Sequence, residues 1–192
     1  MIPSPSVLWF LTAGYLVMVA FFIIQRLLRK TKSARSFRGD RGNMVLIGSV
    51  TGAGLCLPLL LDFLGIAILP IGLGTGLAAI VVMCLGVALR AWAAVTLGEF
   101  YTTTLMVTGN QKVVDTGPYA VVRHPGYLGE VLIWTGFGVL TCNLLLIFLL
   151  PAIFVAAYVY RISVEEKMLV RELGDAYAQY RRKTWRLLPF IY

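Results

Sequence analysis

The chain has 192 residues, of which 59% are hydrophobic and 14% charged, and its mean hydropathy is +0.83. Soluble domains are roughly 45–50% apolar and about 25% charged, so this composition excludes a water-soluble globule. The net charge of +8 comes from Lys and Arg residues beside apolar stretches, which indicates the flanks of membrane spans rather than a nucleic-acid partner.

Three membrane-spanning helices are predicted in the first half of the chain, at residues 7–25, 44–66 and 77–97. Each is close in length to the about 20 apolar residues that a helix needs to cross the hydrocarbon core of a bilayer. The loop 26–43 is rich in Lys and Arg, so the positive-inside rule predicts that it is cytoplasmic and that the N-terminus lies outside. Gly48 and Gly52 have the spacing that allows two helix backbones to approach closely.

Two further spans are predicted in the second half, at residues 127–141 and 143–160, with a tight turn between them. A cytoplasmic loop, 98–126, precedes them, and a charged cytoplasmic tail, 161–192, follows. Apolar and aromatic residues recur at helical spacing in the tail and are interrupted at Gly174, which predicts two short amphipathic helices that cover the loop. The sequence therefore predicts one all-α integral membrane domain, residues 1–192, of about five transmembrane helices, active as a monomer.

A polar segment lies where the chain re-enters the membrane before the fourth span. It contains His124, the single histidine of the chain, and Pro125, which disfavours the α conformation at His124 and predicts a helix start near Gly126. Free N–H groups at such a start suit the carboxylate of a small ligand, and Tyr119 and Tyr127 could add stacking or hydroxyl contacts. The alternative is a re-entrant loop in which the tyrosines only anchor the membrane interface.

A second polar cluster ends the fifth span. Arg161 and Glu165 are four residues apart and share a helix face, and Glu166 follows them. They form either part of a site or a solvated ion pair at a helix end. In the third span, Arg90 lies inside the cytoplasmic end, where it either extends to water or lines a polar pocket. The single His and three separate cysteines argue against a metal site or a disulfide framework.

The second half of the chain resembles the isoprenylcysteine carboxyl methyltransferase family, in its prokaryotic, archaeal-type form, and the related phospholipid methyltransferases. The resemblance covers about residues 98–190. It rests on these motifs: Gly117-Pro118-Tyr119, Arg123-His124-Pro125-Gly126-Tyr127-Leu128-Gly129, Glu165-Glu166, Gly174, Tyr177, Tyr180 and Arg186-Leu187-Leu188-Pro189. The Arg-His-Pro-x-Tyr part also occurs in integral-membrane sterol reductases, which use a nicotinamide cofactor.

The resemblance implies that S-adenosylmethionine binds between the loop before the fourth helix and the tail, without a metal. The cofactor contacts that it implies are Gln111, Lys112, Val113, Val114, Tyr119, His124, Pro125, Gly126, Tyr127, Leu128, Glu165 and Glu166. It also implies that Arg161 binds the substrate. Glu165 would hold this guanidinium or contact the cofactor, and Arg90 is a further candidate substrate contact.

The function expected from these features is methylation of the α-carboxylate of an isoprenylcysteine-like, lipidated substrate. Such a carboxylate is ionised at pH 7, so the reaction needs no general base. Arg161 could orient it through its planar guanidinium, while the lipid reaches the pocket from the bilayer. The alternatives are a phospholipid or amine N-methyltransferase, a sterol-type reductase that uses NADPH, and a small carrier without catalytic activity.

Overall fold

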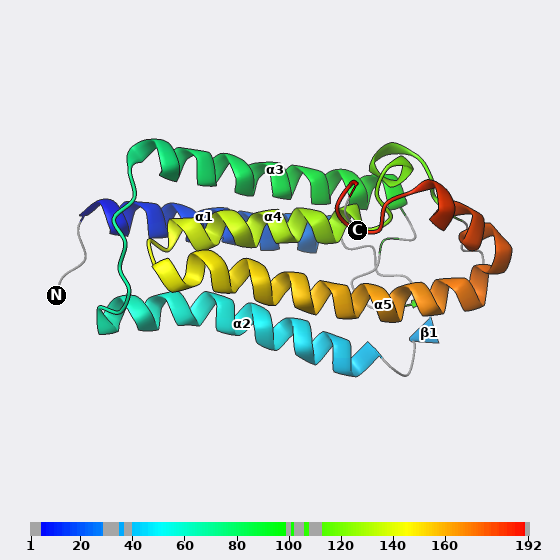
Figure 1. Cartoon of the computed structure of the whole chain (residues 1–192), viewed down its shortest axis with the longest axis horizontal. Coiled ribbons are helices and arrows are strands. Elements are labelled where there is room, and N and C mark those ends of the chain that lie inside the picture. The colour runs from blue at the N-terminus through cyan, green and yellow to red at the C-terminus, as the bar shows by residue number, and fades with distance from the viewer. Residues whose placement is uncertain are drawn as a thin grey trace.

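The computed structural model describes residues 5–28, 35–36, 40–98, 101, 106–107 and 113–190. Its elements are α1 (Pro5–Leu28), β1 (Arg35–Ser36), α2 (Asp40–Leu64), α3 (Leu73–Leu97), β2 (Met106–Val107), the 3-10 helix η2 (Gly117–Ala120), α4 (Pro125–Leu140) and α5 (Leu144–Lys183). In Figure 1, α4 lies between α3 and α5, while α2 runs along the other side of α5. The predicted all-α class is confirmed. The two short strands pair antiparallel with each other.

Among the described residues, four helices are long and apolar enough to cross a membrane: α1, α2, α3 and α5. This confirms an integral membrane protein. Helix α4 has 16 residues and is not among the four, so a fifth transmembrane span stays a prediction. No residue of α4 is exposed in the structure, and it is the most enclosed helix of the bundle.

The close approach of two helix backbones occurs between α3 and α4, which contain glycines at their contact. A Cβ atom on Gly86 would lie 2.5 Å from the carbonyl oxygen of Gly129, and one on Gly129 would lie 2.6 Å from that of Gly86. At Gly48 and Gly52, where the sequence suggested such an approach, no atom of a described residue lies within 4 Å of a Cβ position. Both of these glycines are exposed on α2, so spacing alone did not identify the packed face.

The turn expected between the fourth and fifth helices is confirmed. Helix α4 ends at Leu140, and the side-chain oxygen of Asn143 accepts hydrogen bonds from the backbone N–H groups of Leu145 and Leu146. The amide nitrogen of Asn143 donates to the carbonyl of Ile66 at 2.8 Å. One side chain therefore caps α5 and joins it to the turn between α2 and α3.

Helix α5 differs from the expected pattern of one span followed by two separate short helices. It continues past its apolar part, 144–160, because no Pro or Gly interrupts the sequence between Tyr160 and Leu173. The interruption expected at Gly174 is present, with φ 54° and ψ −130°, a conformation that favours glycine. The polar part of α5 therefore extends directly from the bundle, and the residues after Gly174 turn back toward the start of α4 (Figure 1).

Candidate active site

The start of α4 has the local geometry that the sequence predicted. His124 is the residue before the helix, with φ −124° and ψ 57°, and Pro125 occupies its first turn. The N–H groups of Tyr127 and Leu128 both donate to the carbonyl of His124, at 3.1 Å each. Fewer free N–H groups are therefore available to a ligand than the sequence suggested.

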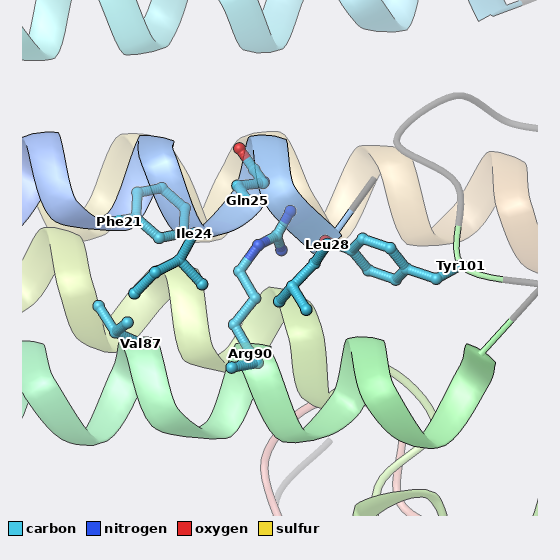
Figure 2. A pocket seen from close by; sticks show the side chains of 8 residues that line it. Phe21, Ile24, Gln25, Leu28, Val87, Arg90 and Tyr101 are labelled. Carbon is cyan, nitrogen blue, oxygen red and sulfur yellow. The ribbon is translucent and has the colours of Figure 1, made fainter. Parts of the chain in front are cut away.

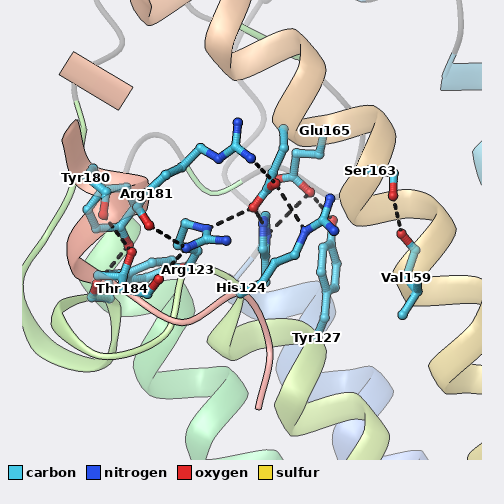
Figure 3. A network of polar contacts seen from close by, with 12 residues as sticks. Arg123, His124, Tyr127, Val159, Ser163, Glu165, Tyr180, Arg181 and Thr184 are labelled. Atoms are coloured by element: carbon cyan, nitrogen blue, oxygen red, sulfur yellow. Dashed lines mark hydrogen bonds and ion pairs between the residues drawn. The ribbon is translucent and has the colours of Figure 1, made fainter. Parts of the chain in front are cut away.

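The hydroxyl of Tyr127 connects the two polar clusters that the sequence singled out. Arg161 Nε donates to Tyr127 Oη at 2.8 Å, and this hydroxyl donates to Glu165 Oε2 at 2.7 Å. The guanidinium carbon of Arg161 lies 5.7 Å from the centre of the Tyr127 ring. Arg161 is 5% exposed, so the interpretation of this cluster as a solvated helix end is wrong. Figure 3 shows Tyr127 extending from α4 toward Glu165 on α5.

Glu166 is surrounded by three arginines and His124 and is only 3% exposed. Its Oε1 atom lies 2.8 Å from Arg123 Nε and 3.4 Å from His124 Nε2, and its Oε2 atom lies 3.1 Å from Arg186 Nε and 3.8 Å from Arg181 Nη2. Burial alone would raise the pKa of Glu166, but the hydrogen bonds and charges of His124 and Arg123 lower it to about 2. Glu166 is therefore a carboxylate that holds several segments together.

Arg123 attaches the last residues of the chain to this site. Its backbone N–H donates to the carbonyl of Trp185 at 2.8 Å, and its Nη1 donates to the carbonyls of Arg181, at 3.1 Å, and Thr184. The hydroxyl of Tyr180 donates to the carbonyl of Tyr119 at 2.7 Å. These contacts cover the polar cluster with the tail, as Figure 3 shows for Tyr180 and Thr184.

Stacked aromatic rings continue from the polar cluster into the helix bundle. The His124 and Tyr127 rings have centres 5.7 Å apart at 13°, and the Tyr127 and Tyr158 rings have centres 5.0 Å apart at 15°. Phe154 then packs against Tyr158 at 6.2 Å and stacks on Trp134 at 4.0 Å. Ring faces beside the Glu165 carboxylate form an environment that suits a cationic ligand.

The structure brings six of the expected site residues into one cluster: Tyr119, His124, Tyr127, Arg161, Glu165 and Glu166. Tyr119 is buried, and burial together with the negative charge of Glu165 raises its pKa. Pro125 is buried below this cluster, and Leu128 packs against the hydrophobic core. Val113 and Val114 are half-buried in the segment before η2. Gln111 and Lys112 lie outside the described residues.

The sequence did not single out two participants in this cluster, Arg181 and Tyr158. Arg123 and Arg186 were recognised in the motifs but received no role. The two tail arginines belong to a basic stretch that is typical of membrane flanks, so their pairing with Glu166 had no distinctive signal. Tyr158 lies in an apolar run, and its only signal is its position three residues before Arg161, on the same helix face.

Arg90 lies apart from this cluster, at a small pocket between α1 and α3 that Figure 2 shows. Its Nη2 atom lies 2.7 Å from Glu130 Oε1, and its Nη1 atom donates to the carbonyl of Gly126 at 2.9 Å. The empty space in the pocket, about 180 Å³, includes open solvent. It is lined by Phe21, Ile24, Gln25, Leu28, Val87, Arg90, Ala91 and Tyr101.

Curated proteins resemble part of this chain. A protein-S-isoprenylcysteine O-methyltransferase of Schizosaccharomyces pombe is 34% identical over 111 residues, which are 57% of this chain and 47% of that protein. A Delta(14)-sterol reductase of Mus musculus is 33% identical over 88 residues, or 44% of this chain and 21% of that protein. The chain therefore spans less than half the length of these two curated relatives.

The fold has a counterpart among solved structures. The eukaryotic intramembrane Ras methyltransferase ICMT matches 98% of this chain and 69% of its own, with a TM-score of 0.66 and 20% identity. Residues 78–171, from α3 into the polar part of α5, match the model of the isoprenylcysteine carboxyl methyltransferase family. This segment contains Arg161, Tyr127 and Glu165, so these site residues lie in the part of the chain that is similar to the isoprenylcysteine carboxyl methyltransferase family.

Proposed function

We propose that this chain is an integral-membrane methyltransferase that uses S-adenosylmethionine to methylate the α-carboxylate of an isoprenylcysteine-like, lipidated substrate. The observation that carries the proposal is the position of Arg161. It is buried where the apolar part of α5 ends, and the Tyr127 hydroxyl links it to Glu165. A lipid-linked carboxylate that arrives from the bilayer would meet a guanidinium there.

The residues around Arg161 fit the methyl donor that the family implies. Tyr119, His124 and Tyr127 would contact it through ring faces and hydroxyl groups, and Glu165 would balance its positive charge. When bound, S-adenosylmethionine supplies an electrophilic methyl group on a sulfonium. The tail after Gly174 would exclude water, because its contacts with Arg123 and Tyr119 hold it over the site.

Arg161 would orient the acceptor rather than exchange protons with it. A carboxylate is already ionised at pH 7, so alignment with the donor and neutralisation of charge are sufficient. The planar guanidinium can bind both carboxylate oxygens, and Tyr127 and Glu165 restrict its rotation. Both interactions require the start of α4 to keep its position beside the polar part of α5.

The orientation proposed for the membrane places the N-terminus outside and the active site and C-terminus in the cytoplasm. The support is the accumulation of Lys and Arg in loop 26–43 and in the tail after residue 160. S-adenosylmethionine would then reach the site from the cytoplasm. We also propose that the chain acts as a monomer.

The purified protein in detergent tests the proposal by calorimetry with S-adenosylhomocysteine, the product, and with NADPH in a parallel titration. We expect binding of S-adenosylhomocysteine and methyl transfer to a prenylcysteine analogue, both reduced in His124→Ala. NADPH binding without S-adenosylhomocysteine binding would instead support the second candidate, a sterol-type reductase. The sterol reductase relative favours that candidate. Binding of neither ligand would contradict both enzyme assignments.

An amine N-methyltransferase is less well supported by the contacts. An amine acceptor needs a base or an acidic pocket, and Glu130 is one carboxylate of the fourth helix that could serve. Glu130 is instead paired with Arg90 at 2.7 Å. A phospholipid amine tested in the same transfer assay, beside the prenylcysteine analogue, separates the two acceptors directly.

A further inference from the structure

An ion pair that the proposed reaction does not use lies between α3 and α4. Arg90 Nη2 is 2.7 Å from Glu130 Oε1, and the two side chains are 11% and 10% exposed. In the orientation that satisfies its neighbours, the amide oxygen of Gln25 on α1 accepts hydrogen bonds from Arg90 Nε, at 3.0 Å, and from Arg90 Nη2. Charged side chains in an apolar bundle are costly to bury, so a pair that is kept there indicates a function rather than a gain in stability.

Arg90 has a second contact, which reaches the site. Its Nη1 donates to the carbonyl of Gly126 at 2.9 Å, in the first turn of α4. No side chain caps this turn, since His124, the residue before it, makes no side-chain capping bond. Arg90 therefore fixes, from α3, the turn that lies between His124 and Tyr127.

Gly129 of α4 makes room for this contact. A Cβ atom on Gly129 would lie 3.0 Å from the backbone nitrogen and 3.1 Å from the Cβ atom of Arg90, whereas one on Gly126 would make an ordinary contact, 3.6 Å from Arg90 Nη1. The Arg90 side chain can thus pass along α4 at short range. Figure 2 shows it leaving α3 and extending toward Gln25 on α1.

We propose that Arg90 and Glu130 are positioning residues for the active site. Glu130 holds the guanidinium of Arg90, and Arg90 fixes the position of the first turn of α4 relative to α3. That turn determines whether His124 faces Glu166 and whether Tyr127 reaches Arg161. The inference rests on the proposed function for its effect on catalysis, whereas its structural part, the order of this turn, can be tested without any ligand.

Two variants separate positioning from a general contribution to folding. Arg90→Lys keeps the charge that pairs with Glu130 but loses the fork that also reaches Gly126. The double variant Arg90→Met with Glu130→Leu removes both charges and fills the space with apolar groups. If the buried pair has only a structural role, this variant should be as stable as the parent. Arg171→Lys, at an exposed arginine of α5, is the matched control.

Hydrogen–deuterium exchange in detergent provides the ligand-independent measurement. We expect faster exchange in Arg90→Lys at the amides of Tyr127 and Leu128, which the His124 carbonyl protects in the parent, with parental exchange in the rest of α4. We also expect at least tenfold weaker binding of S-adenosylhomocysteine in Arg90→Lys and in the double variant, even where the double variant unfolds at the parental temperature.

Parental exchange at Tyr127 and Leu128 in Arg90→Lys would overturn the proposal. So would a higher KM for the lipid acceptor with unchanged S-adenosylhomocysteine affinity, because that result identifies Arg90 as the substrate contact expected from the sequence. If the parent itself does not bind S-adenosylhomocysteine, the proposed function fails, and the exchange measurement still decides whether Arg90 positions the first turn of α4.

Discussion

Replacing Glu166 by Gln removes the negative charge on which three arginine side chains and His124 converge, with little change in volume. Glu166 is 3% exposed, and the nearest of these groups, Arg123 Nε, lies at 2.8 Å. Breaking a buried ion pair by removing one partner costs about 3–5 kcal/mol. The amide can still accept one hydrogen bond, so we expect a loss near the lower end, about 3 kcal/mol.

Thermal unfolding in detergent measures this loss. For a chain of this size, 1 kcal/mol corresponds to about 2–4 °C, so the midpoint should fall by about 6–12 °C. Glu165→Gln is the matched control, because Glu165 is half-buried and binds a neutral hydroxyl donor at 2.7 Å. That bond is worth about 1.5–3 kcal/mol at most, and water can solvate the partly exposed Glu165 side chain when the bond is lost, so a shift below about 4 °C is expected.

Lowering the pH should also show how much the Glu166 carboxylate contributes to stability. The folded pKa of Glu166, about 2, lies below its ordinary value of 4.5. Its contribution to stability is therefore complete above pH 4.5 and is lost as the pH falls toward about 2. Over this interval the parent should lose more stability than Glu166→Gln. Equal unfolding midpoints for Glu166→Gln and Glu165→Gln at neutral pH would refute the reasoning.

Three further outcomes are expected. Arg161→Lys should lower turnover of a prenylcysteine analogue by about one to two orders of magnitude while binding of S-adenosylhomocysteine changes little; near-parental turnover in Arg161→Ala would contradict the proposed role. Gly86→Ala should destabilise the protein by about 1–3 kcal/mol in thermal unfolding, because its Cβ would lie 2.5 Å from the Gly129 carbonyl, whereas Gly48→Ala, with open space around it, should not. A cysteine at Ser36 should resist an impermeant reagent added outside intact cells, and efficient labelling would reverse the proposed topology.

Local chemistry was sufficient to predict several features of the fold. Pro125 restricts the residue before it, which predicted the start of α4. The turn at Asn143 and the interruption at Gly174 follow from the conformational preferences of single residues. Hydropathy identified the apolar helices, because it reports on the solvent around each segment rather than on its partners.

Partners within the bundle could not be obtained from the sequence. Spacing favoured Gly48 and Gly52 as a packing face, but the packed glycines are those of α3 and α4, because packing depends on which helices are neighbours. The resemblance implied cofactor contacts for both Glu165 and Glu166, without distinguishing their partners. In the structure, Tyr127 binds the first, and Arg123 and Arg186 surround the second.

The shortness of α4 affects how deep in the bilayer the site lies. Its 16 residues give a length of about 24 Å, whereas a typical hydrocarbon layer is about 30 Å thick. The start of α5, just after the far end of α4, is joined to the turn between α2 and α3 through the Leu144 N–H and the Ala67 carbonyl, at 2.9 Å. Because longer helices enclose α4, the bilayer need not become thinner around it to match its length. Tyr127 and Arg161 would then lie deeper than the lipid headgroups. The thickness of the bilayer would determine how far the carboxyl group of a lipid-anchored substrate must move to reach them.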